Sequence, residues 1–173
     1  MADRHTHSSG RHNGKAGAAS LVVDSPTAVR NVAVVGPSGS GKTTLVEALL
    51  AHTGTISRAG SITEGTTVCD HDPVAVRQQR SVALALAPLV HEGIKVNLID
   101  TPGYLDFLGE LRAGLRAADA ALFVVCAADG VDEATAALWR ECAEVGMPRA
   151  VVISRLDHPR ADAMGELAAC QSA

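Results

Sequence analysis

The sequence predicts an α/β fold, in which a mainly parallel sheet with one antiparallel hairpin has helices on both faces. Apolar runs typical of buried strands alternate with helical segments from Asn31 onward. Apolar residues make up 47% of the chain but aromatic residues only 2%, so Ala, Val and Leu must fill the interior. This composition suits a parallel sheet covered by helices. A glycine-rich loop also joins the first predicted strand to the first predicted helix.

The first strand is expected at residues 31–35 and the first helix at residues 44–50, with its leucines on one face. Residues 53–80 then lack periodicity and are rich in Gly, Thr and Ser. So long an irregular segment inside a compact domain is usually functional or mobile.

The later elements continue the alternation. Predicted strands at 82–90 and 94–99 flank His91-Glu92-Gly93, which indicates a hairpin turn. The elements expected next are a helix at 105–118, a strand at 120–126, a helix at 131–145, a strand at 150–154 and a helix after Pro159. In such sheets, ligands bind at the C-terminal ends of the strands.

Length and composition bound the function. The 173 residues hold one domain, for which we expect residues 29–173, preceded by a disordered tail at residues 1–28. The net charge of −4 gives no footprint for nucleic-acid binding. No apolar run approaches the roughly 18 residues of a membrane span, and we expect a soluble cytoplasmic protein.

The glycine-rich loop is the first functional motif. Gly36-Pro37-Ser38-Gly39-Ser40-Gly41-Lys42-Thr43 has the spacing of a P-loop. Its glycines can turn successive N–H groups toward phosphate oxygens, and the helix that follows adds its N-terminal dipole. Lys42 is expected to reach the β- and γ-phosphates, and the Thr43 hydroxyl to bind Mg²⁺. The nucleotide-binding residues expected here are Gly36, Ser38, Gly39, Ser40, Gly41, Lys42, Thr43 and Thr44.

Two further motifs follow in order along the chain. Asp100-Thr101-Pro102-Gly103 ends a strand, so Asp100 could hold Mg²⁺ through water and the Gly103 N–H could meet a γ-phosphate. Ser154-Arg155-Leu156-Asp157 follows the last strand. There the Asp157 carboxylate could accept hydrogen bonds from N1–H and the 2-amino group of guanine, a donor pair that adenine lacks.

The three motifs in this order resemble the GTP-binding domain of translational GTPases, specifically elongation factor G and its relatives. The resemblance covers about residues 29 to 170. It implies a three-layer P-loop NTPase fold, binding of GTP and GDP with Mg²⁺, and further domains that contact the ribosome. A domain of this family has another strand and helix after the third motif, so the chain is expected to be incomplete at its C-terminus.

The chain departs from the family pattern at positions tied to hydrolysis. Tyr104 stands where the family carries a water-positioning His, and a phenol cannot take the role of an imidazole near neutral pH. The best match to the family's Arg-Gly-Ile-Thr is Arg80-Ser81-Val82-Ala83, in which Ala83 offers no metal ligand; Thr66 or Thr67 could supply one instead. Ser154 and Arg155 replace the usual Asn and Lys. We therefore expect nucleotide binding with slow or absent GTP hydrolysis.

Other function classes fit less well. A transporter-type ATPase should carry a Leu-Ser-Gly-Gly-Gln signature, which is absent, and a Glu where Thr101 follows Asp100. A nucleotide kinase needs an Arg-bearing lid, for which Arg77 and Arg80 are weak candidates. Within the GTPase interpretation, a fully active translocation factor stimulated by the ribosome and a regulatory or resistance-type factor both stay open.

Overall fold

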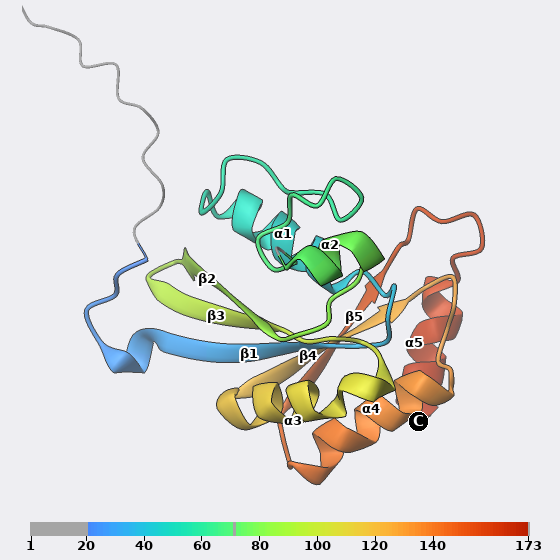
Figure 1. Ribbon diagram of the computed structural model, residues 1–173. Helices are drawn as coiled ribbons and strands as arrows, with labels where there is room; N and C mark the ends of the chain where they lie inside the picture. The colour runs from blue at the N-terminus through green and yellow to red at the C-terminus, as the bar shows by residue number, and fades with distance from the viewer. Residues whose placement is uncertain (1–20, 71, 173) are drawn as a thin grey trace, which may run out of the picture.

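The computed structural model describes residues 21–70 and 72–172. Within these residues, five strands form one sheet in the order β2-β3-β1-β4-β5 (Figure 1). β2 pairs antiparallel with β3, and the other pairings are parallel, which confirms the predicted sheet. The strands are β1 (Val29–Val35), β2 (Ala85–His91), β3 (Ile94–Asp100), β4 (Ala120–Cys126) and β5 (Arg149–Ser154).

Helices cover both faces of the sheet and give the predicted three layers. Figure 1 shows α1 and α2 on one side and α3 and α4 on the other. A short 3-10 helix, η1, precedes β1, and another, η2, leads into α3. The helical elements are η1 (Pro26–Ala28), α1 (Lys42–His52), α2 (Pro73–Gln78), η2 (Leu105–Phe107), α3 (Leu108–Ala117), α4 (Glu133–Glu144) and α5 (Ala163–Ser172).

Two apolar clusters hold the layers together. On the α1 side, Val46 and Leu50 are buried against β1, β3 and β4. On the opposite face, leucines of α3 and α4 pack on β1 and β4. Each fully buried Val or Leu contributes roughly 1.5–3 kcal/mol relative to an exposed position. The two clusters fix the positions of β1, β3 and β4 relative to one another. The loops that follow β1 and β3 therefore start from fixed points at one edge of the sheet.

The hairpin occurs where the sequence predicts it. Glu92 and Gly93 connect β2 to β3, and both have positive φ, at 49° and 77°. Positive φ at both central residues is the requirement of a type I′ turn, whose twist matches that of the strands it joins. β2 begins at Ala85, three residues later than the run starting at Val82 suggested.

The segment between α1 and β2, residues 53–84, is called the connecting segment below. It contains the short helix α2, which the sequence reasoning missed inside the stretch expected to be irregular. Asp72 caps α2 by accepting a hydrogen bond from the Val74 N–H at 2.7 Å, and Pro73 occupies the first turn. Both are recognisable helix-start signals, but the helix is too short to show periodicity.

The predicted tail and the described structure overlap only in part. Residues 1–20 lie outside the described residues. Residues 26–28, within the range assigned to the tail, form η1, which the Ser25 side chain caps by accepting from the Thr27 N–H. In the described part of the chain, no helix is long and apolar enough to cross a membrane.

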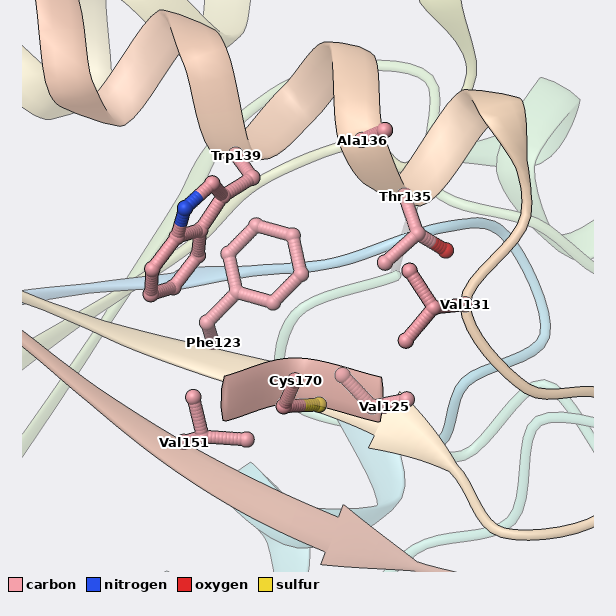
Figure 2. A pocket seen from close by; sticks show the side chains of 8 residues that line it. All are labelled: Phe123, Val125, Val131, Thr135, Ala136, Trp139, Val151 and Cys170. Atoms are coloured by element: carbon pink, nitrogen blue, oxygen red, sulfur yellow. The ribbon is translucent and has the colours of Figure 1, made fainter. Parts of the chain in front are cut away.

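A small apolar pocket lies between α4, β4, β5 and the side chain of Cys170 on α5 (Figure 2). Trp139 meets Phe123 edge to face there, with ring centroids 5.3 Å apart and an interplanar angle of 86°. The Thr135 hydroxyl, which is part of the lining, donates to Asp132 at 2.6 Å. The rest of the lining is mostly apolar.

Candidate nucleotide-binding site

The P-loop lies at the C-terminal end of β1 and runs directly into α1. Gly36 has φ 147°, and a Cβ there would lie 2.3 Å from the Val124 carbonyl oxygen. Gly41 precedes the helix with φ 92°, in the left-handed region that favours glycine. Because a side chain is excluded at Gly36 by a neighbouring strand, the loop is built into the sheet rather than added to its surface.

Lys42 is a buried cation at the start of α1. Its Nζ donates to the carbonyl oxygens of Gly36 and Pro37, at 2.9 and 3.0 Å. Burial lowers the pKa of Lys42 to about 8, while the charges of Asp100 and Asp70 act in the opposite direction. The ammonium group is therefore held inside the loop, where an anionic ligand would replace the favourable water contacts that burial has removed.

Thr43 and Asp100 join the first and second motifs. The Thr43 hydroxyl donates to Asp100 Oδ2 at 2.6 Å. Asp100 is only 1% exposed, and its Oδ1 has no hydrogen-bond partner among the described residues. Burial raises the pKa of Asp100 to about 6, opposed by the Thr43 hydrogen bond and the Lys42 charge. Hard oxygen donors with an unused carboxylate oxygen fit Mg²⁺, which prefers such ligands.

Gly103 packs the second motif directly onto the P-loop. Its carbonyl oxygen accepts a hydrogen bond from the Ser38 N–H at 3.1 Å. A Cβ on Gly103 would lie 2.5 Å from the Ser38 nitrogen and 2.6 Å from Lys42 Nζ. Glycine is required here for close approach, because any side chain would push the two motifs apart.

The third motif contacts the P-loop through Ser154. The Ser154 hydroxyl lies 2.6 Å from the Ser40 carbonyl oxygen and 3.1 Å from that of Val125. Its visible role is thus to brace the loop. Arg155 has φ 54° and lines the cleft described next. Asp157 is exposed, and its carboxylate makes no hydrogen bond or ion pair with the described residues.

A cleft of about 270 Å³ lies where the motifs and the connecting segment meet. The predicted site residues that line it are Ser38, Gly39, Gly41, Lys42, Thr43, Thr44, Gly103, Tyr104 and Arg155. The predicted site residues outside the lining are Gly36, Ser40, Asp100, Ser154 and Asp157. Of these, Ser40 is buried, and its hydroxyl has no hydrogen-bond partner within residues 21–70 and 72–172. Asp100 is joined to the cleft through its hydrogen bond with Thr43.

The connecting segment supplies cleft residues that the sequence reasoning did not select. Ser81 Oγ lies 3.4 Å from Thr43 Oγ1 and donates to Asp70 Oδ2 at 3.1 Å. Ala83, the position compared with the family's metal-binding Thr, is exposed and outside the lining. Ser81 lies within Arg80–Ala83, the stretch that matches the family's Arg-Gly-Ile-Thr, but that match predicts a metal ligand only at its last residue.

Thr66 and Thr67 do not line the cleft either. The Thr66 hydroxyl accepts from the Ser61 N–H at 2.9 Å, and the Thr67 hydroxyl accepts from the Asp70 N–H at 3.2 Å. Both side chains therefore shape the connecting segment. The alternative that one of them supplies a metal ligand is not supported by these positions.

Tyr104 forms one wall of the cleft at the end of the second motif. The Arg80 guanidinium lies over its ring, 4.8 Å from the centroid. Hydrogen bonds with Ser38 and Arg80 lower the pKa of the phenol. Tyr104 thus links the P-loop to the connecting segment across the mouth of the cleft.

Glu47 of α1 is a buried carboxylate that the sequence reasoning did not single out; it is 1% exposed. It accepts hydrogen bonds from the backbone N–H groups of Gly60 and Val68. A charged acceptor satisfying two backbone donors is a strong local anchor. It fixes the first half of the connecting segment against α1, beside the cleft.

Comparison with known proteins identifies the family to which this site belongs. Residues 27–172 match the model described as the elongation factor Tu GTP binding domain. The chain belongs to this family. Membership of this family accounts for the order of the three motifs and for the arrangement of the sheet.

Similar proteins extend the comparison. This GTP-binding domain is 61% identical over its whole length to an elongation factor G-like protein of Mycobacterium tuberculosis. It is 36% identical over 136 residues, 79% of the chain, to elongation factor G 2 of Streptomyces coelicolor. A crystal structure from Thermus thermophilus matches 88% of the chain with 43% identity and a TM-score of 0.79. The chain spans 23%, 20% and 22% of these three proteins, respectively.

Proposed function

We propose that this chain binds GTP and GDP with Mg²⁺, as the guanine-nucleotide domain of an elongation factor G-like translation factor. The observation that carries the proposal is the meeting of Lys42, the Thr43–Asp100 pair and Gly103 at one cleft. Family membership supports guanine as the base. The relatives described as elongation factors support a role in translation.

The phosphates are assigned to the loop and to Lys42. Gly39 and Gly41 line the cleft without side chains that would block the approach of phosphate to the backbone, and the N-terminus of α1 adds a partial positive charge. The Lys42 ammonium exchanges two carbonyl partners for phosphate oxygens, a stronger charge-assisted pairing. Thr43 directly and Asp100 through water would hold Mg²⁺, which would neutralise phosphate charge when bound.

The base is assigned to Arg155 and Asp157. The apolar stem of Arg155, which lines the cleft, covers one face of the guanine. The exposed Asp157 carboxylate accepts from N1–H and the 2-amino group. A site built to accept from these donors discriminates against a base that lacks them, because the Asp157 carboxylate would be covered by the bound base and stay unpaired.

The base assignment is tested by the Asp157→Asn variant with GDP and with xanthosine diphosphate. An asparagine amide can donate to the 2-oxo group of xanthine, but it has one acceptor oxygen where the carboxylate has two, and its NH₂ would face a guanine donor. We expect weaker GDP binding, by tenfold or more, and stronger xanthosine diphosphate binding, measured by calorimetry. Unchanged preference for GDP would show that Asp157 does not read the base.

GTP hydrolysis is proposed to be slow. The support comes from Tyr104, whose phenol is engaged with Ser38 and Arg80, and from Ala83, which lies outside the cleft. A phenol held in this way is a poor substitute for a group that orients an attacking water. The rate is measured with radiolabelled GTP under single-turnover conditions, and turnover like that of an active elongation factor would contradict the proposal.

The partner proposed for the GTP-bound protein is the ribosome, and the place of action the cytoplasm. Support comes from the relatives described as elongation factors. Sedimentation with ribosomes in the presence of a non-hydrolysable GTP analogue tests this. Co-sedimentation that requires the analogue is expected, and equal recovery without nucleotide would argue against it.

A further inference from the structure

We propose that Ser81, supported by Asp70, is the contact through which the connecting segment helps to hold Mg²⁺ at Thr43. The inference rests on the proposed nucleotide function and assigns to this chain's own residues a contact that Ala83 cannot make. Four side-chain oxygens form a continuous chain, and three of them belong to residues that line the cleft. Asp100 Oδ2 lies 2.6 Å from Thr43 Oγ1, which lies 3.4 Å from Ser81 Oγ, which lies 3.1 Å from Asp70 Oδ2.

The protons along this chain leave one contact without a donor. Each hydroxyl carries a single proton. Thr43 donates its proton to Asp100, and Ser81 donates its proton to Asp70. With both protons directed at the carboxylates, the Thr43 and Ser81 oxygens face each other across 3.4 Å with lone pairs alone. Two facing acceptors are favourable when a cation lies beside both.

The spacing of the oxygens agrees with this. Neighbouring ligands of an octahedral Mg²⁺ at about 2.1 Å are separated by about 3.0 Å. The Thr43 and Ser81 oxygens lie 3.4 Å apart, within about 0.4 Å of this separation. Serine and threonine hydroxyls and carboxylates are the hard donors that the ion selects.

The buried charge points to the same conclusion. Asp70 and Asp100 are 6% and 1% exposed, and Glu47 adds a third buried carboxylate whose charge acts on Asp100. Lys42 is the buried ammonium facing them. Asp100 Oδ1 is also buried without a hydrogen-bond partner among the described residues. This excess of negative charge, together with an unused carboxylate oxygen, indicates a cation rather than a purely structural network.

One consequence follows for the connecting segment. Ser81 and Asp70 both belong to it and flank α2, whereas Thr43 and Asp100 belong to α1 and β3. A cation held by both groups would clamp the segment over the nucleotide. Bound Mg²⁺ would then slow nucleotide release more strongly than it would if only Thr43 and Asp100 held the ion.

The test measures the release of a fluorescent GDP analogue as a function of free Mg²⁺. Ser81→Ala and Asp70→Asn are compared with wild type, and Ser57→Ala and Glu64→Gln are matched controls, exposed in the same segment. We expect the free Mg²⁺ that gives half-maximal slowing to rise tenfold or more in both test variants and to stay unchanged in the controls. Wild-type Mg²⁺ dependence in Ser81→Ala would overturn the inference.

Two further measurements separate this inference from folding effects and from the proposed function. Ser81→Thr keeps the hydroxyl, so it should keep the wild-type Mg²⁺ dependence; a loss as large as in Ser81→Ala would overturn the inference. Binding of Mn²⁺ to the GDP complex, followed by electron paramagnetic resonance, should weaken tenfold in Ser81→Ala, and unchanged affinity would also overturn it. Failure of wild type to bind GDP at saturating Mg²⁺ would instead refute the proposed function.

Discussion

Asp100→Asn should stabilise the fold while weakening the metal site. Burial raises the pKa of this carboxyl from 3.8 to about 6. At 1.36 kcal/mol per unit, the ionised carboxylate destabilises the folded chain by about 3 kcal/mol at pH 7.5. Asparagine removes that charge, but its amide leaves a buried donor unpaired, which costs about 1–3 kcal/mol. The variant should therefore be about 0–2 kcal/mol more stable than wild type at pH 7.5.

The pH dependence gives a sharper magnitude, because the amide cost cancels. A raised carboxyl pKa means that the folded chain binds the proton more tightly than the unfolded chain, so stability falls as pH rises between the two values. The penalty is absent below about pH 3.8, about 1.6 kcal/mol at pH 5 and complete above about pH 6. The stability advantage of Asp100→Asn over wild type should therefore shrink by about 1.4 kcal/mol from pH 7.5 to pH 5.

The assay is urea unfolding at both pH values without divalent cations, followed by the fluorescence of Trp139, the single tryptophan of the chain. Asp106→Asn is the control, because Asp106 is an exposed carboxylate only a few residues away. Its stability relative to wild type should not show this shift. An advantage of Asp100→Asn that is the same at pH 5 and pH 7.5 would refute the assignment of a burial-driven pKa to Asp100.

Three further changes probe the contacts around the cleft. Gly103→Ala places a Cβ 2.5 Å from the Ser38 nitrogen, so the loop must shift by roughly 0.9 Å to reach ordinary contact at 3.4 Å. Calorimetry should therefore show GDP affinity reduced tenfold or more. Gly109→Ala, with open space around it, is the control and should bind GDP normally. Glu47→Gln leaves one backbone N–H of the connecting segment unpaired and should lower the free energy of unfolding by about 1–3 kcal/mol. A change below about 0.5 kcal/mol would contradict the role of Glu47 as an anchor. Tyr104→His should raise single-turnover GTP hydrolysis tenfold or more; no increase would show that another position limits the chemistry.

The fold was largely predictable because strand and helix periodicities are strong where elements are long and buried. β4 is an apolar run, β1 ends in one and β3 mostly alternates apolar with polar residues, while the Glu92–Gly93 turn has the positive φ angles of a type I′ hairpin. The helix α2 was missed because six residues are too few for a periodic signal, although Asp72 and Pro73 mark its start.

The candidate site was predictable where a motif fixes both spacing and chemistry. The closeness of Thr43 to Asp100 and of Gly103 to the P-loop follows from parallel strands that end at one edge of the sheet. Ser81, Asp70 and Glu47 were not predicted, because their roles depend on how the connecting segment folds back on α1. Nothing in local sequence separates Ser81, which faces Thr43, from the exposed Ala83 two positions later.

Isothermal titration of the protein with GDP, GTP and ATP in the presence of Mg²⁺ tests the central claim most directly. The geometry of the P-loop alone would accept any nucleoside triphosphate, so the choice of base depends on Arg155 and Asp157. We expect tight binding of GDP and GTP and binding of ATP at least 100-fold weaker, about 2.7 kcal/mol. Tight binding of ATP without binding of GDP would contradict the guanine-nucleotide function.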